Sequence, residues 1–208
     1  MRVLLAGFGR FPGAPFNPSA ALVRTLARRQ RPALADLSRS VHVFATEYAA
    51  VDGDLPKLFA AKPDIVLIFG LAGRRRQICI ETHARNAMSP LFPDVGGYRP
   101  PNAVIETGGP GARFGRAPFF RLIGAMRANK VPVRLSRDAG RYLCNYAYWR
   151  ALQQAPEGRP LVQFVHIPAV APGRWSRRRL KGHRSPSFVQ IVAAAERLLV
   201  ALIAISKR

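Results

Sequence analysis

The run of residues 65–69 is the feature that most constrains what this 208-residue chain can fold into. It reads Ile-Val-Leu-Ile-Phe and ends at Gly70, a pattern typical of a strand that is buried on both faces of a sheet. Such strands occur in α/β proteins, where helices cover the two faces of a mainly parallel sheet. The run therefore favours an α/β fold.

Shorter apolar runs alternate with helix-like patterns along the rest of the chain. A helix is predicted to begin after Asn17, which is a good N-cap residue and is followed by Pro18. This alternation predicts one domain, 1–208, with a twisted, mainly parallel sheet flanked by helices on both faces. The other predicted strands are 3–6, 41–45, 78–81, 131–135 and 161–167, and the other predicted helices are 51–61, 119–128, 144–154 and 188–205.

The stretch 86–113 breaks this alternation, because it is rich in Pro and Gly and has little periodicity. A loop of this length in a compact domain is usually functional or mobile. The apolar stretch 188–205 is interrupted by Glu196 and Arg197, which would be costly at the centre of a bilayer. We expect it to form an amphipathic terminal helix and not a membrane span.

Two cysteines in a chain of this size do not make a secreted disulfide framework. The first residues carry a basic start, but the apolar run after it is too short for a signal peptide. We therefore expect a cytoplasmic protein.

The formal net charge of +22 is the strongest compositional bias. Strongly basic proteins are attracted to phosphate backbones and anionic membranes, and the runs 74–76 and 177–181 have the side chains to bind phosphates. No aromatic interleaving or nucleic-acid module accompanies them. We expect no specific nucleic-acid or membrane partner, and a basic binding protein with little catalysis stays the alternative.

A candidate catalytic group comes from three separate segments. The turn-like stretch 136–143 runs into a helix and places Cys144 at its start, where backbone N–H groups and the helix dipole favour a thiolate and can hold an oxyanion. His166 ends one predicted strand and Glu81 ends another. Because sites in open α/β sheets gather at the carboxyl ends of strands, we expect the three at one edge, as a cysteine-hydrolase triad.

Other interpretations of these residues stay open on local chemistry. Cys144 is also acceptable as a small buried apolar residue, and His166 as a core histidine. His83 shares a strand face with Glu81 and is the rival imidazole, whereas Cys79 on the same face is interpreted as core. The close ligand pairs of zinc sites are missing, and 7–12 lacks the last glycine of a dinucleotide loop, so neither metal nor cofactor is predicted.

Taken together, the motifs resemble those of the type I pyroglutamyl peptidase family over the whole chain. The match includes the opening motif 7–13 with 17–19, the segments 69–73 and 78–81, Asn86, 92–94, 135–145 around Cys144, and 165–168 around His166.

The resemblance implies an α/β cysteine exopeptidase that removes an N-terminal pyroglutamyl residue from peptides without a metal or cofactor. It also implies a peptide substrate with N-terminal pyroglutamate. Homo-oligomers are common in the family, although so positive a surface opposes self-association. By motif, the nucleophile is Cys144, the base is His166 and the orienting carboxylate is Glu81, and the substrate-binding residues are Phe8, Phe11, Asn17, Phe92 and Tyr142.

Several positions depart from the family pattern. Leu91 stands where the family usually has arginine, Arg141 replaces a threonine beside the pocket, and Gly9, Arg10 and Pro12 change the opening loop. These departures leave open an amidase acting on another small acyl group.

Overall fold

A mixed sheet of six strands forms the centre of the computed structural model, which describes residues 1–11, 14–128, 131–155, 159–170 and 185–207. Four strands are mutually parallel, whereas β4 runs antiparallel to β8 and parallel to β7. The predicted α/β fold with a mainly parallel sheet is confirmed. The strand order is β2 (Ser38–Phe44), β1 (Arg2–Phe8), β3 (Ile65–Leu71), β8 (Leu161–Ile167), β4 (Ile78–Glu81) and β7 (Val133–Ser136).

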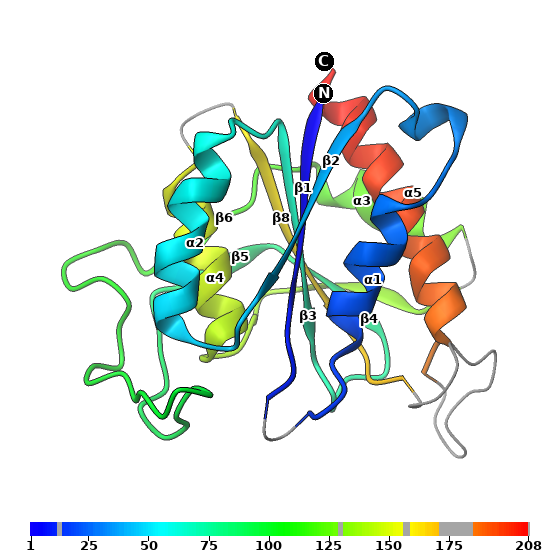
Figure 1. Cartoon of the computed structure of the whole chain (residues 1–208). Helices are drawn as coiled ribbons and strands as arrows, with labels where there is room; N and C mark the ends of the chain where they lie inside the picture. Colours follow the sequence, from blue (N-terminus) through cyan, green and yellow to red (C-terminus); the bar gives the residue numbers. More distant parts are fainter. Residues whose placement is uncertain (12–13, 129–130, 156–158, 171–184, 208) are drawn as a thin grey trace.

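Helices cover both faces of this sheet (Figure 1). The helices α1 (Pro18–Ala27), α3 (Phe119–Arg127) and α5 (Phe188–Ser206) pack on one face. The helices α2 (Tyr48–Ala60) and α4 (Leu143–Gln153) pack on the other. The layers make a single α/β domain, as the sequence predicts.

Strand β3 shows why the run at 65–69 is continuously apolar. Its side chains alternate between two hydrophobic cores, with Ile65, Leu67 and Phe69 facing α1 and α5, and Val66 and Ile68 facing α2 and α4. All five are fully buried. Because each buried side chain of this size stabilises the fold by roughly 1.5–3 kcal/mol, β3 anchors both layers.

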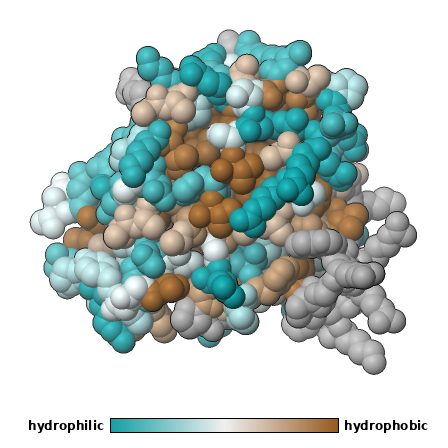
Figure 2. Space-filling view, viewed as in Figure 1, coloured by the Kyte–Doolittle hydropathy of each residue, from teal (hydrophilic) through white to brown (hydrophobic). Residues whose placement is uncertain are grey.

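The edge strand β2 lies at the front of the molecule in Figure 1. Only its last residue, Phe44, is fully buried, and Val41 is 38% exposed. Figure 2 shows apolar side chains across the middle of this face with polar side chains around them. Polar and charged side chains on an edge strand discourage pairing with another chain.

The stretch 86–113 is largely irregular, as predicted, but a small hairpin closes it. Strands β5 (His83–Arg85) and β6 (Ala112–Phe114) pair antiparallel and were not predicted, because three residues are too few to show periodicity. Asn86 binds the base of the loop, since its Oδ1 accepts from the amides of Ile105 and Glu106. The short 3₁₀ helix η1 (Pro32–Leu34) was also not predicted.

Helix α5 is long and apolar enough to cross a membrane by length and composition. It instead packs against α1, α3 and the sheet, with 56% of its apolar window buried. Its one acidic residue, Glu196, is 3% exposed and forms ion pairs with Arg29 and Arg31. The contacts are those of a core helix.

Candidate active site

Cys144 is the second residue of α4, after the N-cap Tyr142. The side chain of Tyr142 makes no capping hydrogen bond, so it leaves the first N–H groups of the helix available beside the sulfur. The buried amide of Asn145 fixes the start of the helix, because it donates to the carbonyls of Arg85 and Ala87 at 2.8 and 2.9 Å and accepts from the amide of Arg85. The helix start is therefore anchored to β5.

His166 donates from Nδ1 to Oε1 of Glu81 at 2.8 Å, and the two side chains are 5% and 0% exposed. In the register of β4 against β8, Glu81 lies opposite Phe164 and His166 lies opposite Cys79. Residues two positions apart on a strand share a face, so Glu81 and His166 are diagonal neighbours on one face.

The strand directions correct the reasoning from sequence. Because β4 is antiparallel to β8, the carboxyl ends of the two strands do not point to the same edge of the sheet. Glu81 and His166 meet across two adjacent strands, and not at a shared edge. The expectation that they lie together is right, but its stated reason is wrong.

The sulfur of Cys144 reaches the same place from α4. A Cβ atom added to Gly70 would lie 2.8 Å from Sγ of Cys144, so the sulfur lies over the main chain of β3. Gly70 pairs with His166 in the register of β3 against β8. Cys144 and His166 line the same pocket, and the charge of Cys144 helps to raise the pKa of His166, so the sulfur and the imidazole lie close together. The structure thus brings together all three residues of the predicted triad.

The protonation of this group follows from its contacts. Burial alone would lower the pKa of His166, but the charges and hydrogen bonds of Cys144 and Glu81 outweigh burial and raise the pKa from 6.5 to about 9. Burial would also raise the pKa of Glu81, yet the hydrogen bond and charge of His166, helped by Ser136 and Arg75, lower it. An imidazolium paired with a carboxylate is favoured at neutral pH.

Arg75 also belongs to this site. Its Nη1 donates to Oε1 of Glu81 at 2.7 Å and to Oγ of Ser136 at 3.3 Å, and its Nη2 donates to the carbonyl of Asp138. The sequence offered it only as part of the basic run 74–76. Nothing in that run distinguishes the middle arginine from its neighbours, which are exposed.

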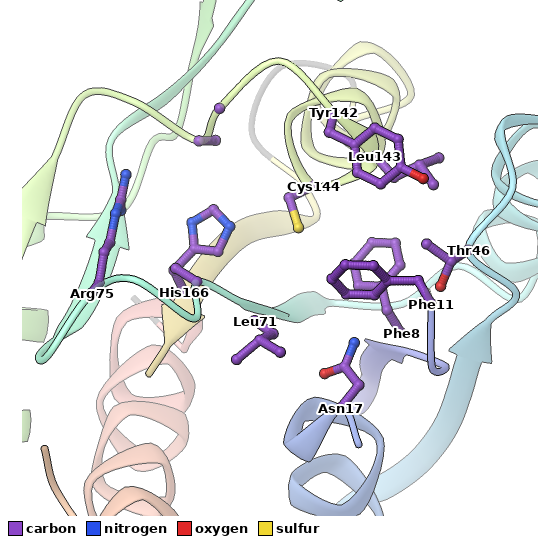
Figure 3. Close-up of a pocket in the computed structure, with 13 residues that line it drawn as sticks. Phe8, Phe11, Asn17, Thr46, Leu71, Arg75, Tyr142, Leu143, Cys144 and His166 are labelled. Carbon is purple, nitrogen blue, oxygen red and sulfur yellow. The ribbon is translucent and has the colours of Figure 1, made fainter. Parts of the chain in front are cut away.

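These residues open into a pocket of about 230 Å³. Figure 3 shows Cys144 beside His166, with Arg75 at one side and aromatic side chains at the other. The aromatic side gives the pocket an apolar wall next to the sulfur. The lining residues are Phe8, Phe11, Asn17, Thr46, Leu71, Ala72, Arg75, Ala139, Gly140, Tyr142, Leu143, Cys144 and His166.

Four of the five predicted substrate-binding residues line this pocket, namely Phe8, Phe11, Asn17 and Tyr142. The structure does not bring Phe92 to it. Phe92 is 63% exposed in the stretch 86–113. The motif match placed this residue without showing the path of its loop.

The opening loop is held by two polar side chains of the pocket. Asn17 donates from Nδ2 to the carbonyl of Gly9 at 2.9 Å, while its Oδ1 accepts from the amide of Ser19 as the N-cap of α1. Thr46 donates to the carbonyls of Gly9 and Arg10 at 3.4 and 3.3 Å. Thr46 was not predicted, because a threonine after a strand carries no signal of its own.

The rival residues lie elsewhere. The ring of His83 packs on Phe114, 5.1 Å between centroids, and does not line the pocket. Burial, with the charges of Arg85 and Arg137, lowers the pKa of His83. Cys79 is fully buried; it pairs with His166 in the register of β4 against β8 but does not line the pocket. Over the described ranges, no group of three His, Cys, Asp or Glu residues could hold a metal ion.

Among the departures from the family pattern that the structure describes, Gly9, Arg10, Leu91 and Arg141 are not lining residues of the pocket. Leu91 is 72% exposed, and Arg141 contributes its carbonyl to a hydrogen bond from the amide of Ser89 at 2.7 Å while its side chain is exposed. Pro12 and the basic run 177–181 lie outside the described residues.

Known proteins are similar to this chain in both sequence and fold. The sequence model of the family described as pyroglutamyl peptidase matches residues 1–208. The pyrrolidone-carboxylate peptidase of Thermococcus onnurineus is 35% identical over 173 residues, which cover 82% of this chain and 84% of the relative.

Two solved structures superpose over nearly the whole chain. The pyrrolidone carboxyl peptidase from Thermococcus litoralis is 29% identical with a TM-score of 0.84, covering 99% of this chain and 95% of that one. The pyroglutamyl peptidase I of Bacillus amyloliquefaciens is 28% identical with a TM-score of 0.81, covering 98% and 97%. The family match over the whole chain, the relatives and the fold together show that this chain belongs to the pyroglutamyl peptidase family of cysteine peptidases.

Proposed function

We propose that this protein hydrolyses the amide bond after the N-terminal pyroglutamyl residue of a peptide, with Cys144 as nucleophile, His166 as proton carrier and Glu81 as the carboxylate that orients it. The observation that carries the assignment is the 2.8 Å contact between Glu81 and His166 beside the sulfur of Cys144, inside a pocket with aromatic walls. A cysteine hydrolase needs these three groups in this order of contact.

The first step is attack of the Cys144 thiolate on the pyroglutamyl carbonyl carbon. A carbon–sulfur bond forms, and the carbonyl oxygen takes the negative charge. The uncapped N–H groups at the start of α4 are the donors for this oxyanion. Each such donor typically contributes about 2.7–4 kcal/mol to the transition state.

Proton transfer by His166 completes the reaction. The imidazolium gives its proton to the leaving amine as the carbon–nitrogen bond breaks, which leaves a thioester on Cys144. Neutral His166 then takes a proton from water, which attacks the thioester and releases pyroglutamate. The hydrogen bond to Glu81 holds Nδ1, so that Nε2 is the nitrogen that exchanges protons.

The pocket suits a small uncharged ring. Phe8 and Phe11 supply apolar contacts near the sulfur, while Asn17 and Thr46 are the polar side chains on the same side (Figure 3). A lactam is neutral and has one N–H and one C=O to pair. Few convergent polar groups within an apolar wall are typical of sites for such ligands.

The test is release of a fluorogenic amine from a pyroglutamyl amide by the purified protein under reducing conditions. We expect release by the wild type and by Cys79→Ser, and none by Cys144→Ser. Prolyl and glutaminyl amides, which lack the lactam carbonyl or the ring, should be cleaved at least about 10²-fold more slowly, since a pocket built for a polar group rejects analogues that leave it unpaired. Equal cleavage of the prolyl amide would contradict the assignment of substrate.

We also propose a cytoplasmic location and self-association through the stretch 86–113. Both cysteines are free thiols, and catalysis by Cys144 requires that it stay reduced. Contiguous exposed apolar groups mark interaction sites, and five large apolar side chains of the stretch are exposed: Leu91, Phe92, Val95, Tyr98 and Val104. Light scattering should show a homo-oligomer at high salt, where the charge of +22 is screened.

A further inference from the structure

Arg75 joins three segments at the edge of the pocket. Its guanidinium contacts the side chain of Glu81 at the end of β4, the hydroxyl of Ser136 at the end of β7 and the carbonyl of Asp138 in the following turn. The Arg75 side chain is 22% exposed, and it is the only Arg, Lys, Asp or Glu among the described residues that line the pocket. Its position is therefore fixed by several bonds, unlike that of an ordinary surface arginine.

One oxygen of Glu81 serves both cationic partners. Oε1 accepts from Nη1 of Arg75 at 2.7 Å and from Nδ1 of His166 at 2.8 Å. Oε2 is buried and accepts no hydrogen bond from the part of the chain that the structure describes. Because both donors are cations on one acceptor, the positive charge of each opposes the attraction of Glu81 for the other.

We propose that Arg75 is a positioning residue that holds the Glu81 carboxylate against His166 and, by sharing Oε1, loosens the hold of Glu81 on the imidazolium proton so that His166 can release it. The proposal rests on the proposed function, because release of this proton to the leaving amine is the step that Arg75 would assist. Without this cation, Glu81 would stabilise the protonated form of His166 more strongly, and His166 would be a weaker acid.

The other groups around this pair do not duplicate the role. His166 faces the sulfur of Cys144 from α4 and that of Cys79 from β4, and Arg134 donates to Cys79 at 3.4 Å. None of these is a fixed cation in contact with the carboxylate of Glu81.

The remaining neighbours act on the main chain or from farther away. Tyr148 and Gln163 donate to the carbonyl of Glu81 and fix its main chain. The charges of Glu81 and Asp138 act to raise the pKa of His83, whereas those of Arg85 and Arg137 lower it. Arg75 is thus the one fixed cation hydrogen-bonded to the Glu81 carboxylate within the described ranges.

The experiment compares Arg75→Met and Arg75→Gln with Arg75→Lys, and uses Arg74→Met and Arg76→Met as matched controls from the same run. The two neutral variants should shift the alkaline limb of the kcat/KM profile upward by about half a pH unit or more, since removing the cation that shares Oε1 of Glu81 strengthens the attraction of Glu81 for the His166 proton. Their kcat should fall about tenfold. Arg75→Lys should restore the limb, and the controls should match the wild type.

A second measurement does not depend on turnover. Titration of labelled histidine by NMR, with the His166 signal assigned by its loss in His166→Ala, should show the same upward shift in Arg75→Gln and its reversal in Arg75→Lys. A shift in this titration without hydrolysis by the wild type would keep the role of Arg75 and reject the proposed function. A folded Arg75→Gln with an unmoved titration would overturn the inference, even if kcat fell.

Discussion

The sulfur of Cys144 lies over the main chain of Gly70, the residue that pairs with His166 on the neighbouring strand. A Cβ at this position would meet Cys144 Sγ at 2.8 Å and Cζ of Phe164 at 2.7 Å. Adjacent strands lie about 4.8 Å apart, so a sulfur over Gly70 is within reach of the imidazole on β8. The approach of Cys144 to His166 therefore requires glycine at position 70, because any Cβ there would displace the sulfur.

Gly70→Ala should therefore displace the sulfur and reduce kcat/KM by about 10²-fold, because misplacement of a reacting group by about 1 Å has this effect. The free energy of unfolding should fall by about 1–3 kcal/mol through overpacking. Gly73→Ala is the matched control, since a Cβ there meets no atom within 4 Å. Kinetics and urea unfolding of both variants test the pair, and full activity of Gly70→Ala would refute this placement of the sulfur.

Replacing the carboxylate should separate orientation from charge. In Glu81→Gln the imidazolium loses its anionic partner, so the pKa of His166 should drop and the alkaline limb of the kcat/KM profile should move to lower pH, opposite to the Arg75 variants. We expect kcat to fall by about 10²–10⁴-fold, the range for a disabled proton carrier. An alkaline limb that stays in place would show that Glu81 does not control His166.

The pH dependence of stability follows from the same pair. The pKa of His166 is raised in the folded state from 6.5 to about 9, so its protonation contributes stability that is fully present below pH 6.5 and is lost as the pH rises through about 9. The Tm of the wild type should fall between these values by more than the Tm of His166→Ala does. Parallel Tm curves for the two proteins would contradict a coupled imidazolium.

Asn145 should prove more important for stability than its neighbours on the surface. Asn145→Ala leaves the partly buried carbonyls of Arg85 and Ala87 without their donor, which should reduce the free energy of unfolding by about 2 kcal/mol. Gln153→Ala, which removes an exposed hydrogen bond to Arg150 from the same helix, should change it by less than about 0.5 kcal/mol. Urea unfolding of the two variants gives the comparison.

The two thiols should differ in reactivity. Cys79 is fully buried, whereas Cys144 is partly exposed in the pocket. The native protein should therefore take up one equivalent of iodoacetamide at neutral pH, at Cys144, and a second only after unfolding. Mass spectrometry of the alkylated peptides locates the label, and labelling of Cys79 in the native state would show that the sheet opens there.

The sequence predicts the elements well because most of the strands and helices carry their own periodicity, as β3 and α5 do. It does not give the direction of β4, because a four-residue strand reads the same in either orientation. The strands β5 and β6 are shorter still and depend on pairing with each other. Strand direction is a property of long-range contacts, which local patterns do not record.

The same division applies to the site. Cys144 and His166 stand at positions with a local chemical meaning, a helix start and the end of an apolar strand, and the family resemblance supports their roles. Arg75 and Thr46 do not, because Arg75 is held by Ser136 and Asp138 as well as by Glu81, and Thr46 binds Arg10, so most of their partners lie far along the chain. Phe92 has a motif match, yet its loop leaves it exposed outside the pocket.

The pairing of β4 with β8 is the one antiparallel seam of the six-stranded sheet in the described ranges. On one side of it lie β3 and β8 with Gly70 and His166, and on the other lie β4 and β7 with Glu81. The hydrogen bond between Glu81 and His166 crosses this pairing, so a local opening that frees β4 and β7 removes the orienting carboxylate from His166 while the four parallel strands stay folded. Activity should then be lost at a lower denaturant concentration than the one that unfolds the core around the four parallel strands. Catalysis would therefore report the opening of part of the sheet before global unfolding.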